Sequence, residues 1–230
     1  MSESKGVLVA IDGPAGSGKS TVSRLVAKRL GIAFLDTGAM YRGLTLASLR
    51  RGIPLDDVGQ VLEEADQMKF RFEGTVDDPR FYLGDDEVTT QIREIEVAQN
   101  VSTVAGLIPV REWMAEEQRR QMLAARECGI GMVAEGRDVA TVVCPDADVK
   151  VLLLADPEAR VRRRTLEMYG EVTPELLEKT RSLVEGRDQI DSLVSEFLKP
   201  AEGVTVVDSS DMTIDEVVDT VIGMVPKIEG

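Results

Sequence analysis

The sequence has no histidine and only two cysteines, Cys128 and Cys144. Metal sites built from Cys and His ligands are therefore excluded, and so is any catalytic triad that uses a histidine base. Two cysteines in a chain of 230 residues need no disulfide. Because both stand among apolar residues, we expect two buried thiols in the reduced state.

Positive charge and long apolar runs are also scarce. Lysine and arginine number 27 against 41 aspartates and glutamates, so the formal net charge is −14. Such a charge disfavours non-specific binding to nucleic acid or to an anionic membrane. No apolar run approaches the ~20 residues that a membrane span requires, and the N-terminus lacks an apolar signal region. We expect a cytoplasmic protein without nucleic-acid or membrane partners.

The segment 7–21, VLVAIDGPAGSGKST, has the strongest pattern in the chain. The apolar run at 7–11 predicts a buried parallel strand, and apolar residues at helical spacing from Thr21 predict a helix. A strand, a glycine-rich turn and a helix are the context that the G-x-x-x-x-G-K-[ST] motif requires. Backbone N–H groups and Lys19 would hold nucleotide phosphates, and the Ser20 hydroxyl would ligate Mg²⁺. The candidate phosphate-binding residues are Gly13, Pro14, Ala15, Gly16, Ser17, Gly18, Lys19, Ser20 and Thr21.

The chain as a whole alternates apolar strands with amphipathic helices. Strands are expected at 7–11, 33–35, 132–134, 149–154 and 204–207. This alternation predicts an α/β fold with a central parallel sheet flanked by helices. Residues 69–88 break the pattern, because alternating apolar residues and turns there predict a small antiparallel β insert. We expect a single domain over 1–230, with the insert spanning about 63–110.

Polar residues gather where two predicted strands end. The first group is the segment 36–42, DTGAMYR, read as a short turn at 37–39 that leads into a helix. The second group is 135–138, EGRD. Ligands of open parallel sheets bind beyond the carboxyl ends of strands, so both groups are candidates for a second ligand near the phosphates. The alternatives are a helix cap with a surface arginine for the first group and a surface ion pair for the second.

Arginines are concentrated between residues 157 and 187. Arg160, Arg163 and Arg164 share one face of a predicted helix, and Arg162 does not. We expect an arginine-rich lid over about 157–187, because phosphoryl transfer needs cations on the migrating group and exclusion of water. The alternative is a solvated basic helix. The segment RDQIDS at 187–192 is, without context, only a polar helix end.

Together these motifs resemble those of the bacterial cytidylate kinases, a branch of the nucleoside monophosphate kinases. The resemblance rests on GPAGSGKST, on DTGAMYR, on EGRD followed by TVVCPDA, and on RDxxDS, and it covers nearly the whole chain. It implies a P-loop kinase fold in which the β insert belongs to the monophosphate-binding part. It also implies a phosphotransferase that uses ATP and Mg²⁺.

The resemblance further implies roles for individual residues. Lys19, Arg137, Arg160 and Arg163 would be catalytic. The acceptor nucleotide would be held by Asp36, Thr37, Tyr41, Arg42, Ser102, Arg111, Arg137, Asp138, Arg187 and Asp191. Within this set, Ser102, Arg111 and Asp138 match the positions that read the cytosine edge. Arg42 and Arg137 match the acceptor phosphate, and Arg187 and Asp191 match the sugar. The family usually has another arginine where this chain has Val194.

The combined interpretation is an ATP-dependent kinase that converts CMP, and also dCMP, to the diphosphate. We expect a monomer whose partners are these small nucleotides. One alternative is a P-loop kinase with another acceptor, such as UMP or a non-nucleotide molecule. Another is a GTPase-like switch, since the run 151–156 ends in aspartate as a Mg²⁺-binding strand does. The chain lacks an N/T-K-x-D motif for reading guanine, which argues against the switch.

Overall fold

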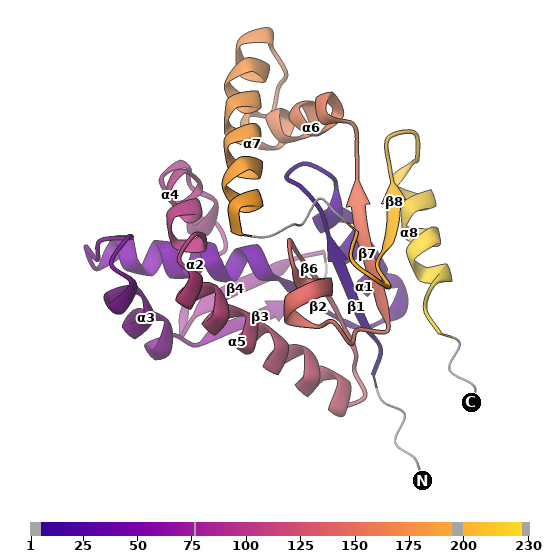
Figure 1. Ribbon diagram of the computed structural model, residues 1–230, viewed down its shortest axis with the longest axis horizontal. Coiled ribbons are helices and arrows are strands. Elements are labelled where there is room, and N and C mark those ends of the chain that lie inside the picture. The colour runs from indigo at the N-terminus through magenta and orange to yellow at the C-terminus, as the bar shows by residue number, and fades with distance from the viewer. Residues whose placement is uncertain (1–5, 76, 195–199, 227–230) are drawn as a thin grey trace.

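The computed structural model describes residues 6–75, 77–194 and 200–226, without the side chains of residues 167 and 187–194. Its centre is a parallel sheet with the strand order β2-β6-β1-β7-β8 (Figure 1). The strands are β1 (Leu8–Asp12), β2 (Ala33–Asp36), β6 (Met132–Gly136), β7 (Val149–Leu154) and β8 (Thr205–Asp208). The order places β1 in the middle, between two strands that come much later in the sequence. The predicted α/β class and parallel sheet are confirmed.

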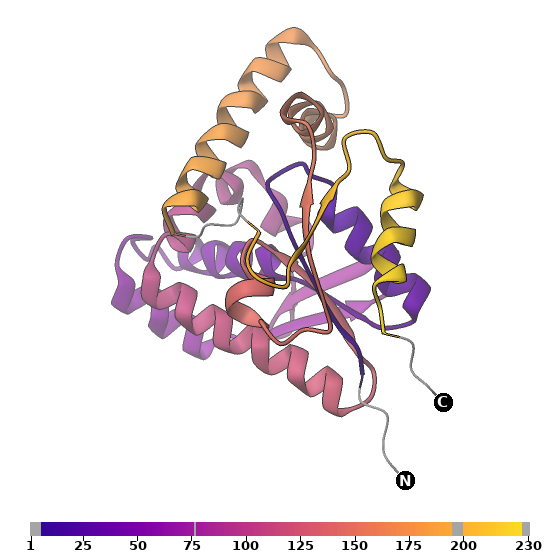
Figure 2. The same ribbon diagram turned by 45° about the vertical axis from the view of Figure 1, so that its right-hand side comes forward.

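Helices cover both faces of this sheet (Figure 2). Successive side chains of a strand point to opposite faces, and β1 follows that rule. Leu8 and Ala10 pack in the apolar core that includes α2 (Thr37–Arg50) and α5 (Ile108–Glu127). Val9 and Ile11 pack in the other core, which includes α1 (Lys19–Leu30) and α8 (Ile214–Gly223). Among the described residues, no helix combines the length and the apolar character needed to cross a membrane.

The insert is a three-stranded antiparallel sheet beside the main one, as its alternation predicts. It consists of β3 (Phe70–Gly74), β4 (Pro79–Leu83) and β5 (Asp86–Glu87), preceded by α3 (Val58–Gln67) and followed by η1 (Gln91–Arg93) and α4 (Ile95–Ala105). Phe81 is buried at its centre. Its ring lies 4.8 Å from that of Phe72 and 6.0 Å from that of Phe70, centroid to centroid.

The arginine-rich segment forms a helical hairpin beyond the carboxyl end of β7 (Figure 1). It consists of α6 (Pro157–Tyr169) and α7 (Pro174–Val194), so the second helix extends past residue 187, where the expected lid ends. A bidentate ion pair joins the helices, with Arg181 Nη1 and Nη2 at 2.5 and 2.8 Å from the two Glu158 carboxylate oxygens. In both views the far end of α7 approaches α4, and the two helices are in contact (Figures 1 and 2).

Three details differ from the expectations. The predicted turn at 37–39 is instead the first turn of α2, because Asp36 caps this helix by accepting a hydrogen bond from the Ala39 N–H at 2.9 Å. A π-helical turn, η2 (Val139–Val143), follows β6 and was not predicted. Cys128 is exposed just beyond the end of α5, so the expectation of two buried thiols is wrong for this residue. Cys144 is buried, and burial raises the pKa of its thiol to about 11.

We predict that Gly43→Ala destabilises the fold. A Cβ at Gly43, in α2, would lie 2.7 Å from Phe81 Cε1 and 3.0 Å from Leu83 Cδ2. The Phe81 ring is held by its neighbours, so overpacking of about 1–3 kcal/mol should outweigh the gain of about 1 kcal/mol in helix propensity. Thermal or urea unfolding measures the difference. The matched control is Gly186→Ala in α7, where no described atom lies within 4 Å of the new methyl. Equal or higher stability of Gly43→Ala would contradict this packing.

Candidate active site

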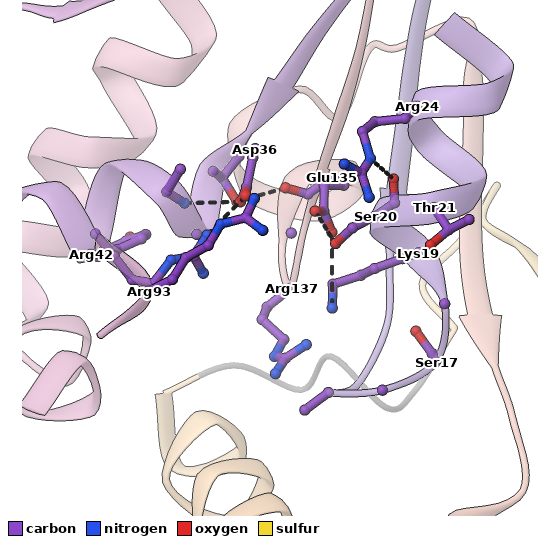
Figure 3. A pocket seen from close by; sticks show the side chains of 18 of the residues that line it. Ser17, Lys19, Ser20, Thr21, Arg24, Asp36, Arg42, Arg93, Glu135 and Arg137 are labelled. Carbon is purple, nitrogen blue, oxygen red and sulfur yellow. Dashed lines mark hydrogen bonds and ion pairs between the residues drawn. The ribbon is translucent and has the colours of Figure 1, made fainter. Parts of the chain in front are cut away.

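One cavity of about 830 Å³ opens where β1, β2 and β6 end. It is lined by the phosphate loop on one side and by α2, α4 and the start of α5 on the other. Figure 3 shows the side chains that meet where the strands end. The predicted site residues that line the cavity are Ala15, Gly16, Ser17, Gly18, Lys19, Ser20, Thr21, Asp36, Thr37, Tyr41, Arg42, Ser102, Arg111, Arg137, Asp138 and Arg163.

The phosphate loop has the geometry of an anion-binding turn. Gly16 and Gly18 have φ values of 74° and 89°, in the left-handed region that glycine adopts without strain. A Cβ at Gly16 would lie 2.5 Å from the Arg160 carbonyl oxygen, so a side chain there would push the loop away from α6. α1 begins at Lys19 without a side-chain cap or an acidic residue in its first turn. Its N–H groups and positive end therefore face the cavity.

Two polar side chains of this loop, those of Ser17 and Lys19, line the cavity. Ser17 is buried, and its hydroxyl has no hydrogen-bond partner among the described residues. A buried hydroxyl without a partner is unfavourable, so its placement beside the anion-binding turn favours an oxygen-rich ligand there. The Lys19 ammonium is 3.3 Å from the Pro14 carbonyl oxygen and 3.9 Å from Glu135 Oε2. Lys19 therefore lies between the loop backbone and the Glu135 carboxylate, at the wall of the cavity.

Two carboxylates stand side by side at the ends of β2 and β6, because Asp36 is the register partner of Glu135. Glu135 is buried and accepts a hydrogen bond from the Ser20 hydroxyl. Burial, followed by the neighbouring charge of Asp36, raises the pKa of Glu135. Burial also opposes the charge of Asp36, but Arg42 at 2.8 Å and the Ala39 N–H hold the pKa of Asp36 below its ordinary value. The pKa values of Glu135 and Asp36 are therefore shifted in opposite directions.

Three arginines approach the phosphate loop through its backbone carbonyl oxygens. Arg137 donates to the Gly13 oxygen, Arg160 donates to the Ala15 oxygen at 3.1 Å, and Arg163 donates to the Ser17 oxygen at 3.5 Å. Arg137 comes from the end of β6, whereas Arg160 and Arg163 come from α6. The loop is therefore surrounded by positive charge from two different parts of the chain, which suits a ligand with several negative charges.

The side of the cavity opposite the phosphate loop contains a pair of oppositely charged side chains. Arg111, near the start of α5, donates to the Asp138 carboxylate and to the Ala105 carbonyl oxygen at 3.2 Å. Both side chains are largely buried, with 15% and 18% of the side chain exposed. Ser102 and Tyr41 line the same region. A donor and an acceptor held side by side in a partly dry cavity can recognise a planar ring with a matching edge.

Comparison with known proteins identifies the chain. The family model described as cytidylate kinase matches residues 9–227. A cytidylate kinase of Cutibacterium acnes is 44% identical over 221 residues, covering 96% of each chain. A cytidylate kinase of Limosilactobacillus fermentum is 45% identical over 226 residues, covering 97% of each chain. The chain belongs to the cytidylate kinase family. A shikimate kinase of Acinetobacter baumannii superposes with a TM-score of 0.44 at 14% identity, covering 96% of this chain and 93% of that one.

Some residues expected from the cytidylate kinase resemblance lie elsewhere. Gly13 does not line the cavity, while Pro14 and Arg160 line a separate hollow together with residues that follow β7 and β8. Arg162 is exposed and lines neither, as its helix face predicts. Arg187 lies in α7, as does Asp191, but their side chains are outside the described part of the structure. The side chain of Val194 is outside it as well.

Three residues of this cytidylate kinase family member were not predicted as site residues. Glu135 was noted only as part of the EGRD segment, and Asp12 was not noted at all. Asp12 is the last residue of β1 and Glu135 is the last but one of β6, and a position at the carboxyl end of a strand is the signal that the sequence offers. Arg93, in η1, lines the cavity and is one of the positive charges that lower the pKa of Asp36. Figure 3 shows it beside Arg42, and no pattern in the sequence pointed to it.

We predict that inorganic tripolyphosphate stabilises the folded protein and that Lys19→Ala weakens this effect. At a tripolyphosphate concentration of about a hundred times its dissociation constant, binding to the folded state adds about 2.7 kcal/mol to the free energy of unfolding. Removing the ammonium from the loop should cost about tenfold in affinity or more. Thermal unfolding with and without the anion measures the shift. Lys28→Ala is the control, since Lys28 lies in the same helix but pairs with Asp77 at 2.7 Å on the surface. Equal shifts for wild type and Lys19→Ala would contradict the assignment.

Proposed function

We propose that this protein transfers the γ-phosphoryl group of ATP to CMP, and also to dCMP, giving ADP and the cytidine diphosphate. The observation that carries the proposal is the continuity of the cavity. The phosphate loop with Lys19 and the Ser102, Arg111 and Asp138 set line the same space. A donor phosphate chain and an acceptor nucleotide can therefore meet in it. Membership of the cytidylate kinase family supports the same conclusion.

The donor would lie with its phosphates in the turn formed by residues 13–18. The N–H groups of the loop, the N-terminus of α1 and Lys19 would bind the β- and γ-phosphates. Arg160 and Arg163 would turn from the loop carbonyl oxygens toward the migrating group, since guanidinium groups can exchange one oxygen acceptor for another. Such cations stabilise the charge that builds up as the phosphoryl group moves.

Mg²⁺ fits this site through the Ser20 hydroxyl and the ATP phosphates. Among the described residues, no group of three or more acidic or thiol side chains is arranged to hold a metal. Mg²⁺ usually binds through one or two protein oxygens, phosphates and water. The Glu135 carboxylate, hydrogen-bonded to Ser20, would accept a hydrogen bond from a metal-bound water. When bound, the ion neutralises part of the phosphate charge.

The acceptor is already an anion, so the reaction needs no general base. Arg42 and Arg137 would hold the CMP phosphate in line with the γ-phosphoryl group, and Arg93 would add a third positive charge on that side. Positioning of the two phosphates and neutralisation of their charge would then supply the catalysis. Thr37 is fixed for this purpose by its hydrogen bond to the Glu135 carbonyl oxygen at 2.7 Å. Asp36 would hold Arg42 in place.

The pairing of Arg111 with Asp138 suits cytosine. Its N4 amine is a donor, which the Asp138 carboxylate would accept. Its O2 and N3 atoms are acceptors, to which Arg111 and Ser102 would donate. Uracil presents an acceptor where cytosine presents the amine, so two acceptors would oppose each other at Asp138. Two buried acceptors that face each other without a donor would weaken the binding of UMP by about 1–3 kcal/mol or more.

Further parts of the proposal concern the insert, the arginine-rich hairpin and the sugar. The insert at about 63–110 would act as the monophosphate-binding part, and residues 157–187 would close as a lid over the phosphates. The many arginines of that segment repel each other without a ligand, which favours closure on binding nucleotide. Arg187 and Asp191 would contact the sugar. The net charge of −14 supports small nucleotides, rather than nucleic acid or a membrane, as the partners of a cytoplasmic monomer.

We predict that Glu135→Gln raises the Mg²⁺ requirement. The variant keeps a hydrogen-bond acceptor for Ser20 but loses the charge, and loss of such an outer partner typically weakens metal binding about 10–100-fold. The measurement is the Mg²⁺ concentration for half-maximal ADP formation at fixed ATP and CMP. Glu64→Gln is the matched control, because Glu64 is equally buried but pairs with Arg51 at 2.8 Å outside the cavity. An unchanged Mg²⁺ dependence in Glu135→Gln would remove this carboxylate from the metal site.

The central test measures ADP formation with CMP, dCMP and UMP as acceptors. We expect CMP-dependent ADP formation, with kcat/KM for CMP at least about tenfold above that for UMP. Asp138→Asn should lower the ratio of kcat/KM for CMP to that for UMP, because an amide can rotate to donate to the uracil O4 atom. The control is Asp146→Asn, since Asp146 also pairs with an arginine, Arg119 at 2.6 Å, but lies outside the cavity. ADP formation that does not depend on CMP would refute the proposed function. An unchanged CMP/UMP ratio would refute only the role of Asp138.

A further inference from the structure

Asp12, the last residue of β1, holds two backbone N–H groups of a distant turn. Its Oδ1 accepts from the Val139 N–H at 2.9 Å, and its Oδ2 accepts from the Ala140 N–H at 2.8 Å. These residues begin η2, directly after Asp138. Asp12 itself directly precedes Gly13, the first residue of the phosphate loop. One carboxylate therefore joins the loop that would bind ATP to the turn that carries Asp138.

A charged side chain in this position is unfavourable for folding. Asp12 is 4% exposed, and burial raises its pKa to about 7, even though the two N–H groups lower it. The charged groups facing it are Asp138, which raises its pKa further, and Lys19, which lowers it. Arg137 lies close by, since it donates to the neighbouring Gly13 carbonyl oxygen. A neutral residue would be easier to bury here, so stability alone does not account for the aspartate.

We propose that Asp12 is a positioning residue for the acceptor site, whose ionised carboxylate holds η2 so that Asp138 and Arg137 face the acceptor nucleotide. This inference rests on the proposed function. The Asp138 carbonyl oxygen accepts hydrogen bonds from the Val142 and Val143 N–H groups at 2.8 and 3.2 Å, within the turn that Asp12 anchors. The backbone of Asp138 is thus held from inside η2, and η2 is held by Asp12. The direction of the Asp138 side chain depends on both.

Protonation of Asp12 should loosen this arrangement. An ionised carboxylate offers acceptors to both N–H groups, whereas a protonated one turns one oxygen into a donor. One N–H of η2 would then face a hydroxyl oxygen, which is a weaker acceptor than a carboxylate oxygen. The folded protein should be ionised at Asp12 above about pH 7 and protonated below it. Discrimination between acceptor bases should therefore be full at about pH 8 and reduced at about pH 6.

The experiment is the ratio of kcat/KM for CMP to kcat/KM for UMP, measured between about pH 6 and about pH 8. The acceptor phosphate also titrates near pH ~6, but it does so in both nucleotides and cancels in the ratio. In wild type we expect the ratio to fall several-fold toward the acid end, with its midpoint near Asp12's pKa of about 7. In Asp12→Asn the ratio should be low throughout and independent of pH. The KM for CMP should rise about tenfold, with a smaller change in the KM for ATP.

Asp148→Asn is the matched control. Asp148 also links its loop to β1, by accepting from the Leu8 N–H at 2.8 Å, but at the opposite end of the strand. This variant should keep the wild-type ratio and its pH dependence even if it lowers stability. A wild-type ratio that does not change with pH would overturn the inference, and this result does not require Asp12→Asn to fold. A pH dependence that persists in Asp12→Asn would also overturn it. Absence of CMP turnover by wild type would instead refute the proposed function.

Discussion

The parallel pairing of β1 with β6 is the constraint on which the site depends. This pairing sets Asp12 beside Gly136, and the pairing of β2 with β6 sets Asp36 beside Glu135. Three strand ends that are far apart in the sequence thereby reach one edge of the sheet. Because β7 pairs in parallel with the other side of β1, the phosphate loop emerges from the middle of the sheet, and the cavity opens beside it. That opening is where ligands of such sheets bind.

The electrostatics of the site follow from this convergence. Partly buried charges interact more strongly than exposed ones, so a small number of groups decides which ligand is favoured. The carboxylates at the strand ends are each matched by a cation or by backbone N–H groups, and the arginines approach from outside. The result is a positively charged rim around a core of acidic and hydroxyl groups, within a protein whose net charge is −14. Such a site suits a ligand with several negative charges.

Much of this arrangement could be predicted from the sequence, because its signals are local. The phosphate loop was identified from a continuous motif, and the insert from its alternating pattern. The π-helical turn could not be predicted, since it depends on hydrogen bonds from Val139 and Ala140 to Asp12, more than a hundred residues earlier. Glu135 was overlooked as a site residue for a related reason, because its contact with Ser20 exists only once two strands pair. Cys128 was misjudged because apolar neighbours in sequence do not bury a residue beyond a helix end.

The arginines around the phosphate loop have a consequence for how the protein can vary. Arg160 and Arg163 donate to the backbone oxygens of Ala15 and Ser17, not to their side chains. Every amino acid carries the same carbonyl oxygen, so these contacts survive most substitutions at the two loop positions. The side chains at these two loop positions can therefore change while the arginines stay the same, and related sequences should show little covariation between the arginines and the loop residues that they contact.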